Sequence, residues 1–223
     1  ALESRYHEHA FWSRLAQNRW YSALGLVVLL SFGIADWLVV PQVLDRVLEA
    51  RLGMSGLMVV ALVLGFIPRL ARHFPLIMGG MTLVIHAGLL YIGELAAGIG
   101  MFHYQAGTLL PVVFLCMVLR VRFAQVWPVV LMLWLLQVTG VGWLMSLPPQ
   151  QITDLIFLHT FLSFIALVSS YRMEYEHRLT FAQQWLLESD KRALETARQE
   201  LETLSTTDGL TQVANRRLFN QRL

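Results

Sequence analysis

The chain has 223 residues, of which 56% are hydrophobic and 14% are charged, and its formal net charge is +2. Soluble domains carry about a quarter charged residues, so this composition excludes an ordinary soluble domain and indicates lipid as the main solvent. The small charge excludes a nucleic-acid partner, which needs a basic stripe, and the single Cys116 excludes an intrachain disulfide and a thiolate metal cluster.

The first element in chain order is residues 1–19, which we expect to be a cytoplasmic amphipathic segment. Residues 20–171 follow as a membrane domain, because its apolar segments approach the roughly 20 helical residues that cross a bilayer core about 30 Å thick. The six expected spans are 20–40, 54–68, 75–97, 104–119, 126–145 and 152–171. The predicted fold class is therefore all-α, a six-transmembrane-helix bundle.

Arginine placement predicts the orientation of these spans. Positive residues near span ends stay on the cytoplasmic side. The arginines before the first span, in the second and fourth connections and after the last span are Arg5, Arg14, Arg19, Arg69, Arg72, Arg120, Arg122, Arg172 and Arg178. The third and fifth connections contain no Lys or Arg, and the first carries Arg46 and Arg51 beside Asp45 and Glu49. Both termini are therefore expected in the cytoplasm.

Residues 172–206 form a charged helical segment without Gly or Pro. Apolar residues recur in it on two positions of a seven-residue repeat: Leu187, Leu194, Ala197, Leu201 and Leu204. This spacing predicts a short parallel coiled-coil seam, and hence a homodimer, although Asp190 occupies a core position. The alternative is a single solvated helix lying against the following domain.

A short motif follows this helix. Asp208-Gly209-Leu210-Thr211 is separated by three residues from Asn215-Arg216-Arg217. Over about the last 20 residues the chain resembles the start of the GGDEF family of diguanylate cyclases, which carries such a signature directly after a signalling helix. Residues 207–223 would then begin an α/β GGDEF domain.

This resemblance implies a function for the motif. Asn215 would contact the guanine base of GTP, and Asp208 would support the first turn of the domain; the alternative for Asn215 is a helix cap or turn residue. The catalytic Gly-Gly-Asp/Glu-Glu-Phe loop, with its Mg²⁺-binding carboxylates, is expected beyond Leu223. The fragment is therefore expected to be inactive, whereas the full-length enzyme would join two GTP molecules into cyclic di-GMP at the bacterial inner membrane.

Two histidines lie deep inside predicted spans. His86 is 11 residues and His159 is 13 residues from the cytoplasmic end of its span, which places them at depths of about 16 and 20 Å. Ionisable residues inside a membrane mark function by default. One hypothesis is that they are the axial ligands of haem b. The alternative is that each is neutral and bonds a group such as Thr82, Thr160 or Ser163 within the bundle.

A second polar set is expected towards the outside of the membrane, and it consists of Asp36, Glu94, His103, Gln105 and Asp154. These residues are interpreted either as an outward-opening pocket for a small extracellular molecule or as interfacial residues that touch headgroups and water.

The sequence favours a transmembrane sensory and dimerisation module of a diguanylate cyclase. A passive membrane scaffold that pairs the cyclase is the first alternative. A small-molecule transporter-like bundle is the second, but the sequence shows neither an inverted repeat nor paired breaks within its spans.

Overall fold

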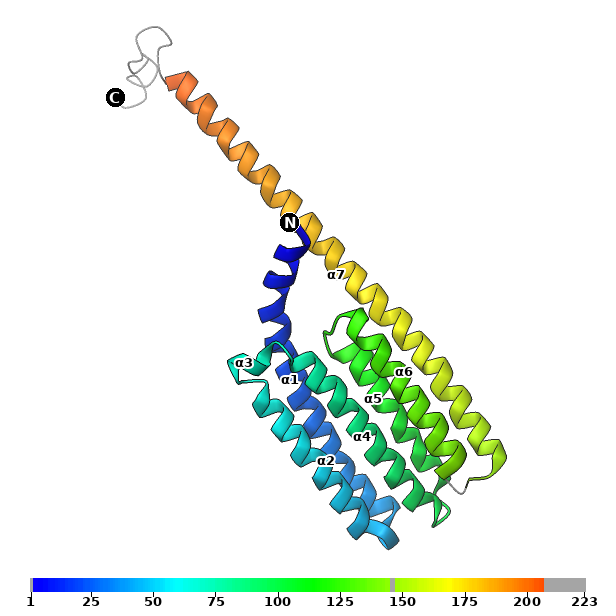
Figure 1. Cartoon of the computed structure of the whole chain (residues 1–223). Helices are drawn as coiled ribbons and strands as arrows, with labels where there is room; N and C mark the ends of the chain where they lie inside the picture. Colours follow the sequence, from blue (N-terminus) through cyan, green and yellow to red (C-terminus); the bar gives the residue numbers. More distant parts are fainter. Residues whose placement is uncertain (1, 145–146, 207–223) are drawn as a thin grey trace. The chain divides into compact units, whose positions relative to one another are not determined.

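The structure is a computed structural model that describes residues 2–144 and 147–206. These residues are helical almost throughout and contain no strand, which confirms the all-α prediction. The chain divides into two compact units, Ala1–Glu174 and Tyr175–Leu223, and the elements of the first unit are arranged side by side (Figure 1).

The helical elements follow one another with short connections. They are α1 (Leu2–Val39), η1 (Pro41–Val43), α2 (Leu44–Leu64), α3 (Pro68–Ala71), α4 (Phe74–Ala97), η2 (Phe102–Leu109), α5 (Leu110–Val113), η3 (Phe114–Val118), α6 (Phe123–Thr139), η4 (Gly140–Leu144) and α7 (Pro149–Thr206). Among the described residues, five helices are long and apolar enough to cross a membrane, in α1, α2, α4, α6 and α7.

Two predicted segments differ from the structure. The expected span over 104–119 is a shorter apolar stretch, Phe102–Val118, built from a 3₁₀ helix, one α-helical turn and a π-helical turn. Helix α2 of the second span begins at Leu44, ten residues before the expected start of the span, because the charged residues that the sequence places in a loop are helical.

The expected amphipathic segment at the N-terminus is, from Leu2 onwards, the first part of α1.

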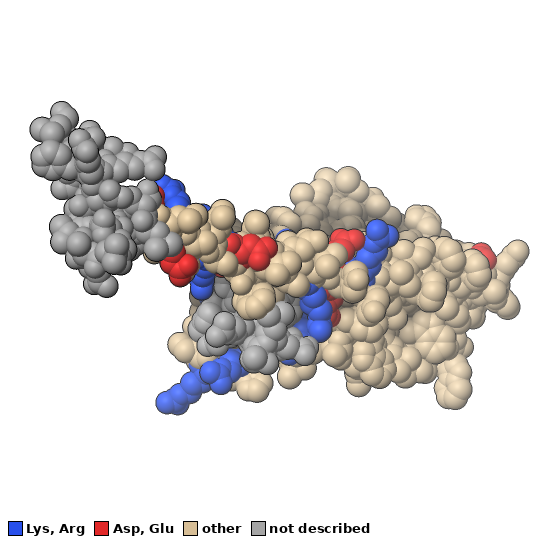
Figure 2. Space-filling model, turned by 90° about the horizontal axis from the view of Figure 1, so that it is seen from above, with Lys and Arg blue, Asp and Glu red and all other residues tan. Residues whose placement is uncertain are grey.

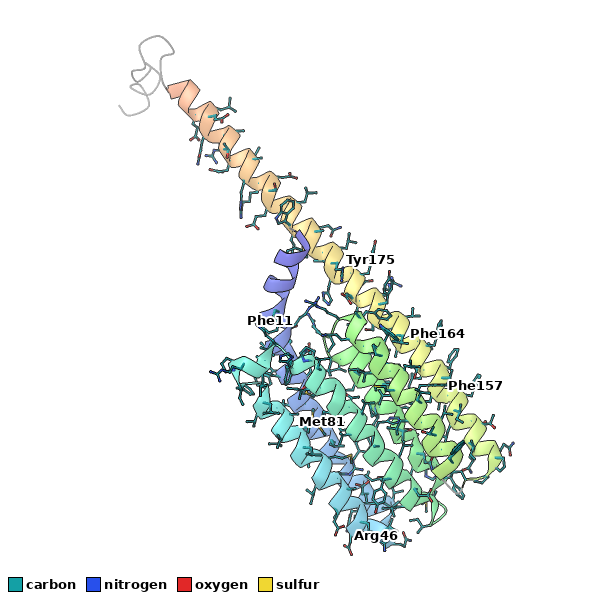
Figure 3. The ribbon with its side chains drawn as sticks, viewed as in Figure 1. Phe11, Arg46, Met81, Phe157, Phe164 and Tyr175 are labelled. Carbon is teal, nitrogen blue, oxygen red and sulfur yellow. The ribbon has the colours of Figure 1, made fainter. Side chains whose placement is uncertain are left out.

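Helix α4 lies at the centre of the first unit and packs against α2, η2, α5 and α6. Its Phe74 and Met78 are buried with Met58 of α2, Leu115 of η3 and Leu133 of α6 in one apolar core. Outward-facing positions are apolar as well, as expected for helices surrounded by hydrocarbon rather than water. Phe157 and Phe164 point away from the bundle on α7, whereas Met81 lies within it (Figure 3).

Polar contacts tie the helix ends at the side of the bundle that carries the arginines. The Asn18 side chain accepts a hydrogen bond from the Arg120 amide (2.8 Å) and donates one to its carbonyl (3.3 Å). Arg19 donates to the Gly65 carbonyl (2.6 Å), and its guanidinium lies 4.4 Å from the centre of the Phe66 ring. Figure 2 shows one face of the molecule, on which most of the surface is uncharged and the arginines stand in small groups.

The second unit contains the last part of α7, a charged and exposed helix. Two ion pairs link successive turns, Arg192 to Glu188 (3.3 Å) and Arg198 to Glu202 (3.2 Å). The leucines of the predicted seam, Leu187, Leu194 and Leu201, are 71%, 73% and 67% exposed in the single chain. Ala197 is exposed too, and the side chain of Leu204 lies outside the described part of the structure.

Candidate functional site

The structure brings the two membrane histidines together. His86 is on α4 and His159 is on the first half of α7, and their ring centroids are 5.4 Å apart with the ring planes at 67°. Both side chains are buried, with 0% and 1% of their surface exposed. The similar depths predicted from the helical rise therefore correspond to a direct contact between the imidazoles.

The polar atoms of this pair lack hydrogen-bond partners among the described residues: neither Nδ1 nor Nε2 of either histidine has one. The side-chain amide atoms of Gln105 and Gln137 and the Ser163 hydroxyl are likewise buried without partners. The Thr108 backbone and the Gln137 side chain approach the His86 ring without reaching hydrogen-bond geometry. Buried polar groups are almost always partnered, so each exception requires an explanation. We name His86, His159 and Gln137 the histidine core.

The expected hydrogen bonds from the histidines to nearby hydroxyls do not form. Thr82 donates to the Met78 carbonyl (2.8 Å), and Thr160 donates to the Ile156 carbonyl (2.7 Å) while accepting from the Trp134 indole (2.8 Å). These hydroxyls are thus already engaged within their own helices. The interpretation of the histidines as ordinary interhelical hydrogen-bonding groups gains no support from these contacts.

The two imidazoles of the histidine core are too few to hold a bare metal ion, but they are enough for a metal group that supplies most of its own ligands. No group of three or more His, Cys, Asp or Glu side chains that would hold a metal ion occurs among the described residues. Haem needs only axial ligands from the protein, since the porphyrin supplies the other four, and imidazole is a common axial ligand. The space beside Gly88 is filled by the Met54 side chain.

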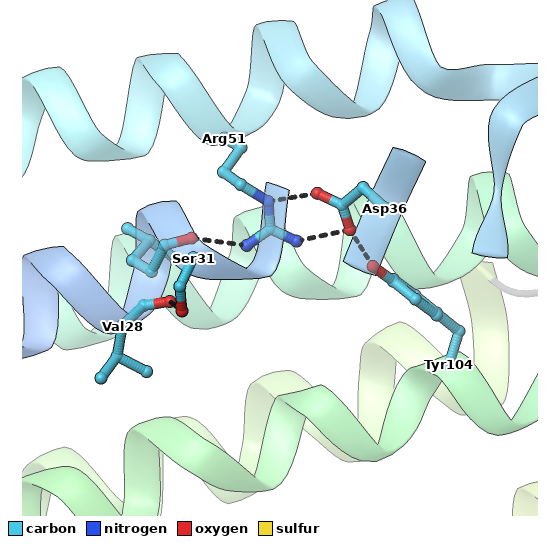
Figure 4. A network of polar contacts seen from close by, with 6 residues as sticks. Val28, Ser31, Asp36, Arg51 and Tyr104 are labelled. Atoms are coloured by element: carbon cyan, nitrogen blue, oxygen red, sulfur yellow. Dashed lines mark hydrogen bonds and ion pairs between the residues drawn. The ribbon is translucent and has the colours of Figure 1, made fainter. Parts of the chain in front are cut away.

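A second polar cluster lies between α1, α2 and η2 (Figure 4). Arg51 donates from Nε to Asp36 Oδ2, from Nη2 to Asp36 Oδ1 (2.8 Å) and from Nη1 to the Leu29 carbonyl (3.1 Å). The Tyr104 hydroxyl donates to Asp36 Oδ1. Asp36 is fully buried and Arg51 is 3% exposed, so this ion-pair network is an interior feature rather than an interfacial one.

The structure does not gather the expected outer polar set into one pocket. Asp36 is in the ion-pair network, and Gln105 is buried with both amide atoms unpartnered. Glu94 is half-buried, whereas His103 and Asp154 are exposed. The sequence analysis places Arg51 in a loop and does not name Gln137 as a site residue. The signal for Gln137 in the sequence is an amide inside an otherwise apolar run.

A cavity of about 520 Å³ lies beside the ion-pair network. It is lined by residues of α1, α2, α4, η2, α5 and η3, including Arg51, His103 and Tyr104. Neither histidine of the histidine core lines it. The first unit therefore holds two separate features, a buried histidine pair and an apolar cavity with a polar end.

Long apolar helices around buried polar groups are typical of a membrane-associated sensory domain, and a family match supports this class. Residues 34–188 match the MASE8 family, and the chain belongs to this family of membrane-associated sensory domains. The match includes Asp36, His86 and His159 and extends into the exposed part of α7. Neither the curated proteins nor the solved structures contained a match.

The nucleotide-binding prediction lies elsewhere. Asp208 and Asn215, for which the GGDEF resemblance implies contacts with GTP, are outside the described residues, and they follow the segment matched by the family.

Proposed function

We propose that the chain is the sensory and dimerisation part of a diguanylate cyclase of the bacterial inner membrane. The observation that supports this most strongly is helix α7, which is continuous from Pro149 in the membrane unit to Thr206. Residues 207–223, which carry the GGDEF-like motif, follow it directly in the sequence. In this proposal both termini are cytoplasmic, as the arginine distribution favours.

A second copy of the chain is the proposed partner of the last part of α7. Leucines at seven-residue spacing that are about 70% exposed in one chain become buried when two such helices pair in parallel. Pairing would place two GTP-binding domains face to face, as formation of cyclic di-GMP from two GTP molecules requires. The Mg²⁺ needed for that reaction would be held by the cyclase domain.

The histidine core is the proposed sensing site, and haem b is the proposed group that it holds. His86 and His159 would hold the haem, which would supply one-electron redox chemistry when bound. His159 and the first seam residue, Leu187, belong to the same helix, α7. In this proposal a shift of α7 at His159 would be relayed along the helix to the seam.

The output is tested with the full-length protein expressed in a bacterial host that lacks its own diguanylate cyclases. Cellular cyclic di-GMP should rise, and it should fall to background with Asn215→Ala but not with the matched Gln212→Ala, which changes a variable position of the motif. Equal cyclic di-GMP from both variants would contradict the role of Asn215. An absence of cyclic di-GMP with the unaltered protein would contradict the proposed output.

The sensing site is tested by the absorption spectrum of the purified chain. A Soret band is expected, and it should disappear with His86→Ala and with His159→Ala but persist with His103→Ala, which leaves the histidine core intact. A missing Soret band in protein grown with added haem precursor would contradict the haem proposal and leave the output unaffected. Unchanged cyclase output in both histidine variants would favour a passive scaffold.

A further inference from the structure

The cavity beside the ion-pair network is lined largely by helices long and apolar enough to cross a membrane. Most of its lining residues on these helices belong to α1 and α4, and both helices are membrane-crossing candidates. Its volume of about 520 Å³ is in the range of pockets that enclose small organic ligands, about 300–1,000 Å³. Spans of this length and composition are surrounded by hydrocarbon in a bilayer, so we expect an apolar ligand to reach the cavity from the lipid.

The body of the cavity is apolar. It is bordered by Leu24 and Val28 of α1, Met78 and Ile85 of α4, and Phe114 of η3. Arg51 is the only Arg, Lys, Asp or Glu among the described residues that line it. A flexible hydrocarbon chain is the kind of group that such walls accommodate, since apolar surface prefers an apolar environment.

The polar end of the cavity is formed by Arg51, His103 and Tyr104. The guanidinium has five N–H donors, and the structure assigns three of them to Asp36 and the Leu29 carbonyl. Two N–H groups of Arg51 therefore remain for an acceptor, whereas the single Tyr104 hydroxyl proton is used by Asp36. The head group that suits this end is a hydrogen-bond acceptor.

The charge of this end also selects the head group. The Asp36 carboxylate neutralises Arg51 at the cavity wall, so no net charge favours a carboxylate or a phosphate there. Aromatic rings are available instead, because Phe32 and Tyr104 both line the cavity. Rings of this kind pack well against a flat, uncharged group.

We propose that the cavity binds an alkyl or polyprenyl quinone, with its carbonyl oxygen at Arg51 and its chain along α1 and α4. A quinone combines the features that the site requires: an uncharged planar head, carbonyl acceptors and one long apolar chain. A phospholipid has two chains and a charged phosphate, for which the described lining offers no unneutralised cation. The site is independent of the histidine core and of the output domain.

The test uses the whole chain in nanodiscs of a single phosphatidylcholine, with decylubiquinone as the probe. Gly107 lines the cavity, and a Cβ added there meets no atom within 4 Å, so Gly107→Leu fills the cavity without a clash at its first carbon. Gly56 on α2 is equally open but faces away from the cavity, and Gly56→Leu is the matched control. Ala35→Leu, on the α1 wall, is a second filling variant if Gly107→Leu does not fold.

Saturable quenching of tryptophan fluorescence by decylubiquinone is expected with the unaltered chain. Filling the cavity should weaken binding by at least about tenfold, because the added side chain occupies the space of the ligand. Gly56→Leu should leave the affinity within about twofold, because its side chain lies outside the cavity. Equal affinities of the filled and control variants would overturn the proposal. Equally tight binding of decanoate, or only non-saturable partition into the nanodisc, would overturn it as well.

Discussion

The two buried polar clusters of the membrane unit differ in how completely their atoms are partnered. In the ion-pair network, both Asp36 oxygens accept hydrogen bonds and all three nitrogens of Arg51 donate. In the histidine core, neither ring nitrogen of His86 or His159 has a partner among the described residues. An ion pair whose nitrogens and oxygens are each bonded to a fixed partner holds one arrangement, whereas ring nitrogens without any partner retain free donors and acceptors. The first therefore suits a structural role and the second suits sensing.

The largest expected effect comes from breaking the ion-pair network. Asp36→Ala leaves the Arg51 guanidinium buried without its counter-ion, and loss of one partner of a buried pair costs about 3–5 kcal/mol. The free energy of unfolding in mixed micelles should fall by that amount. The double variant Asp36→Leu with Arg51→Leu should recover most of the loss, because no uncompensated charge remains. Unaltered stability of Asp36→Ala would contradict the structural role.

The dimer seam should show the next largest effect. Leu194→Lys places a charge in the predicted interface and removes a leucine whose burial contributes about 1.5–3 kcal/mol. The variant dimer should therefore dissociate at a higher protein concentration than the unaltered dimer. Sedimentation of the chain in detergent measures this. Leu186→Lys is the matched control, since Leu186 is an exposed leucine of the same helix outside the seam. Equal dissociation of both variants would argue against the seven-residue register.

Substitutions in the histidine core should change stability much less than substitutions in the ion-pair network. His86→Leu removes a ring that has no hydrogen-bond partner, so the free energy of unfolding of the haem-free chain should change by only about 1 kcal/mol. The same substitution should abolish any response of the full-length cyclase to its stimulus. Destabilisation as large as that of Asp36→Ala would show that the histidine core is structural.

The smallest effect is expected on the exposed helix of the second unit. Arg198 and Glu202 form an ion pair but are 70% and 64% exposed, and such pairs contribute about 0.5 kcal/mol or less. Arg198→Ala should leave the helix content by circular dichroism nearly unchanged in low and high salt. A marked loss of helix would indicate that this residue has a further partner.

The sequence predicts those parts of the membrane unit that depend on one helix at a time. Apolar length identifies α1, α4, α6 and α7, and the constant rise of a helix puts His86 and His159 at matching depth. The ion pair of Arg51 with Asp36 is not predicted, because it depends on how α1 and α2 pack against each other. The distribution of charges along the chain does not reveal this packing. The broken segment from Phe102 to Val118 is missed for a similar reason, since its 3₁₀ and π turns leave its composition unchanged.

The proposed signal passes from the membrane unit to the output along α7, so a change in the phase of this helix should disrupt regulation. One full-length variant carries a seven-residue heptad inserted after Glu188, and a second carries a four-residue insertion at the same place. Seven residues preserve the repeat of the seam, whereas four shift it relative to the membrane unit. We predict that cyclic di-GMP output, measured in cells, survives the first insertion and loses its regulation with the second. Equal, fully regulated output from both insertions would contradict signalling through α7.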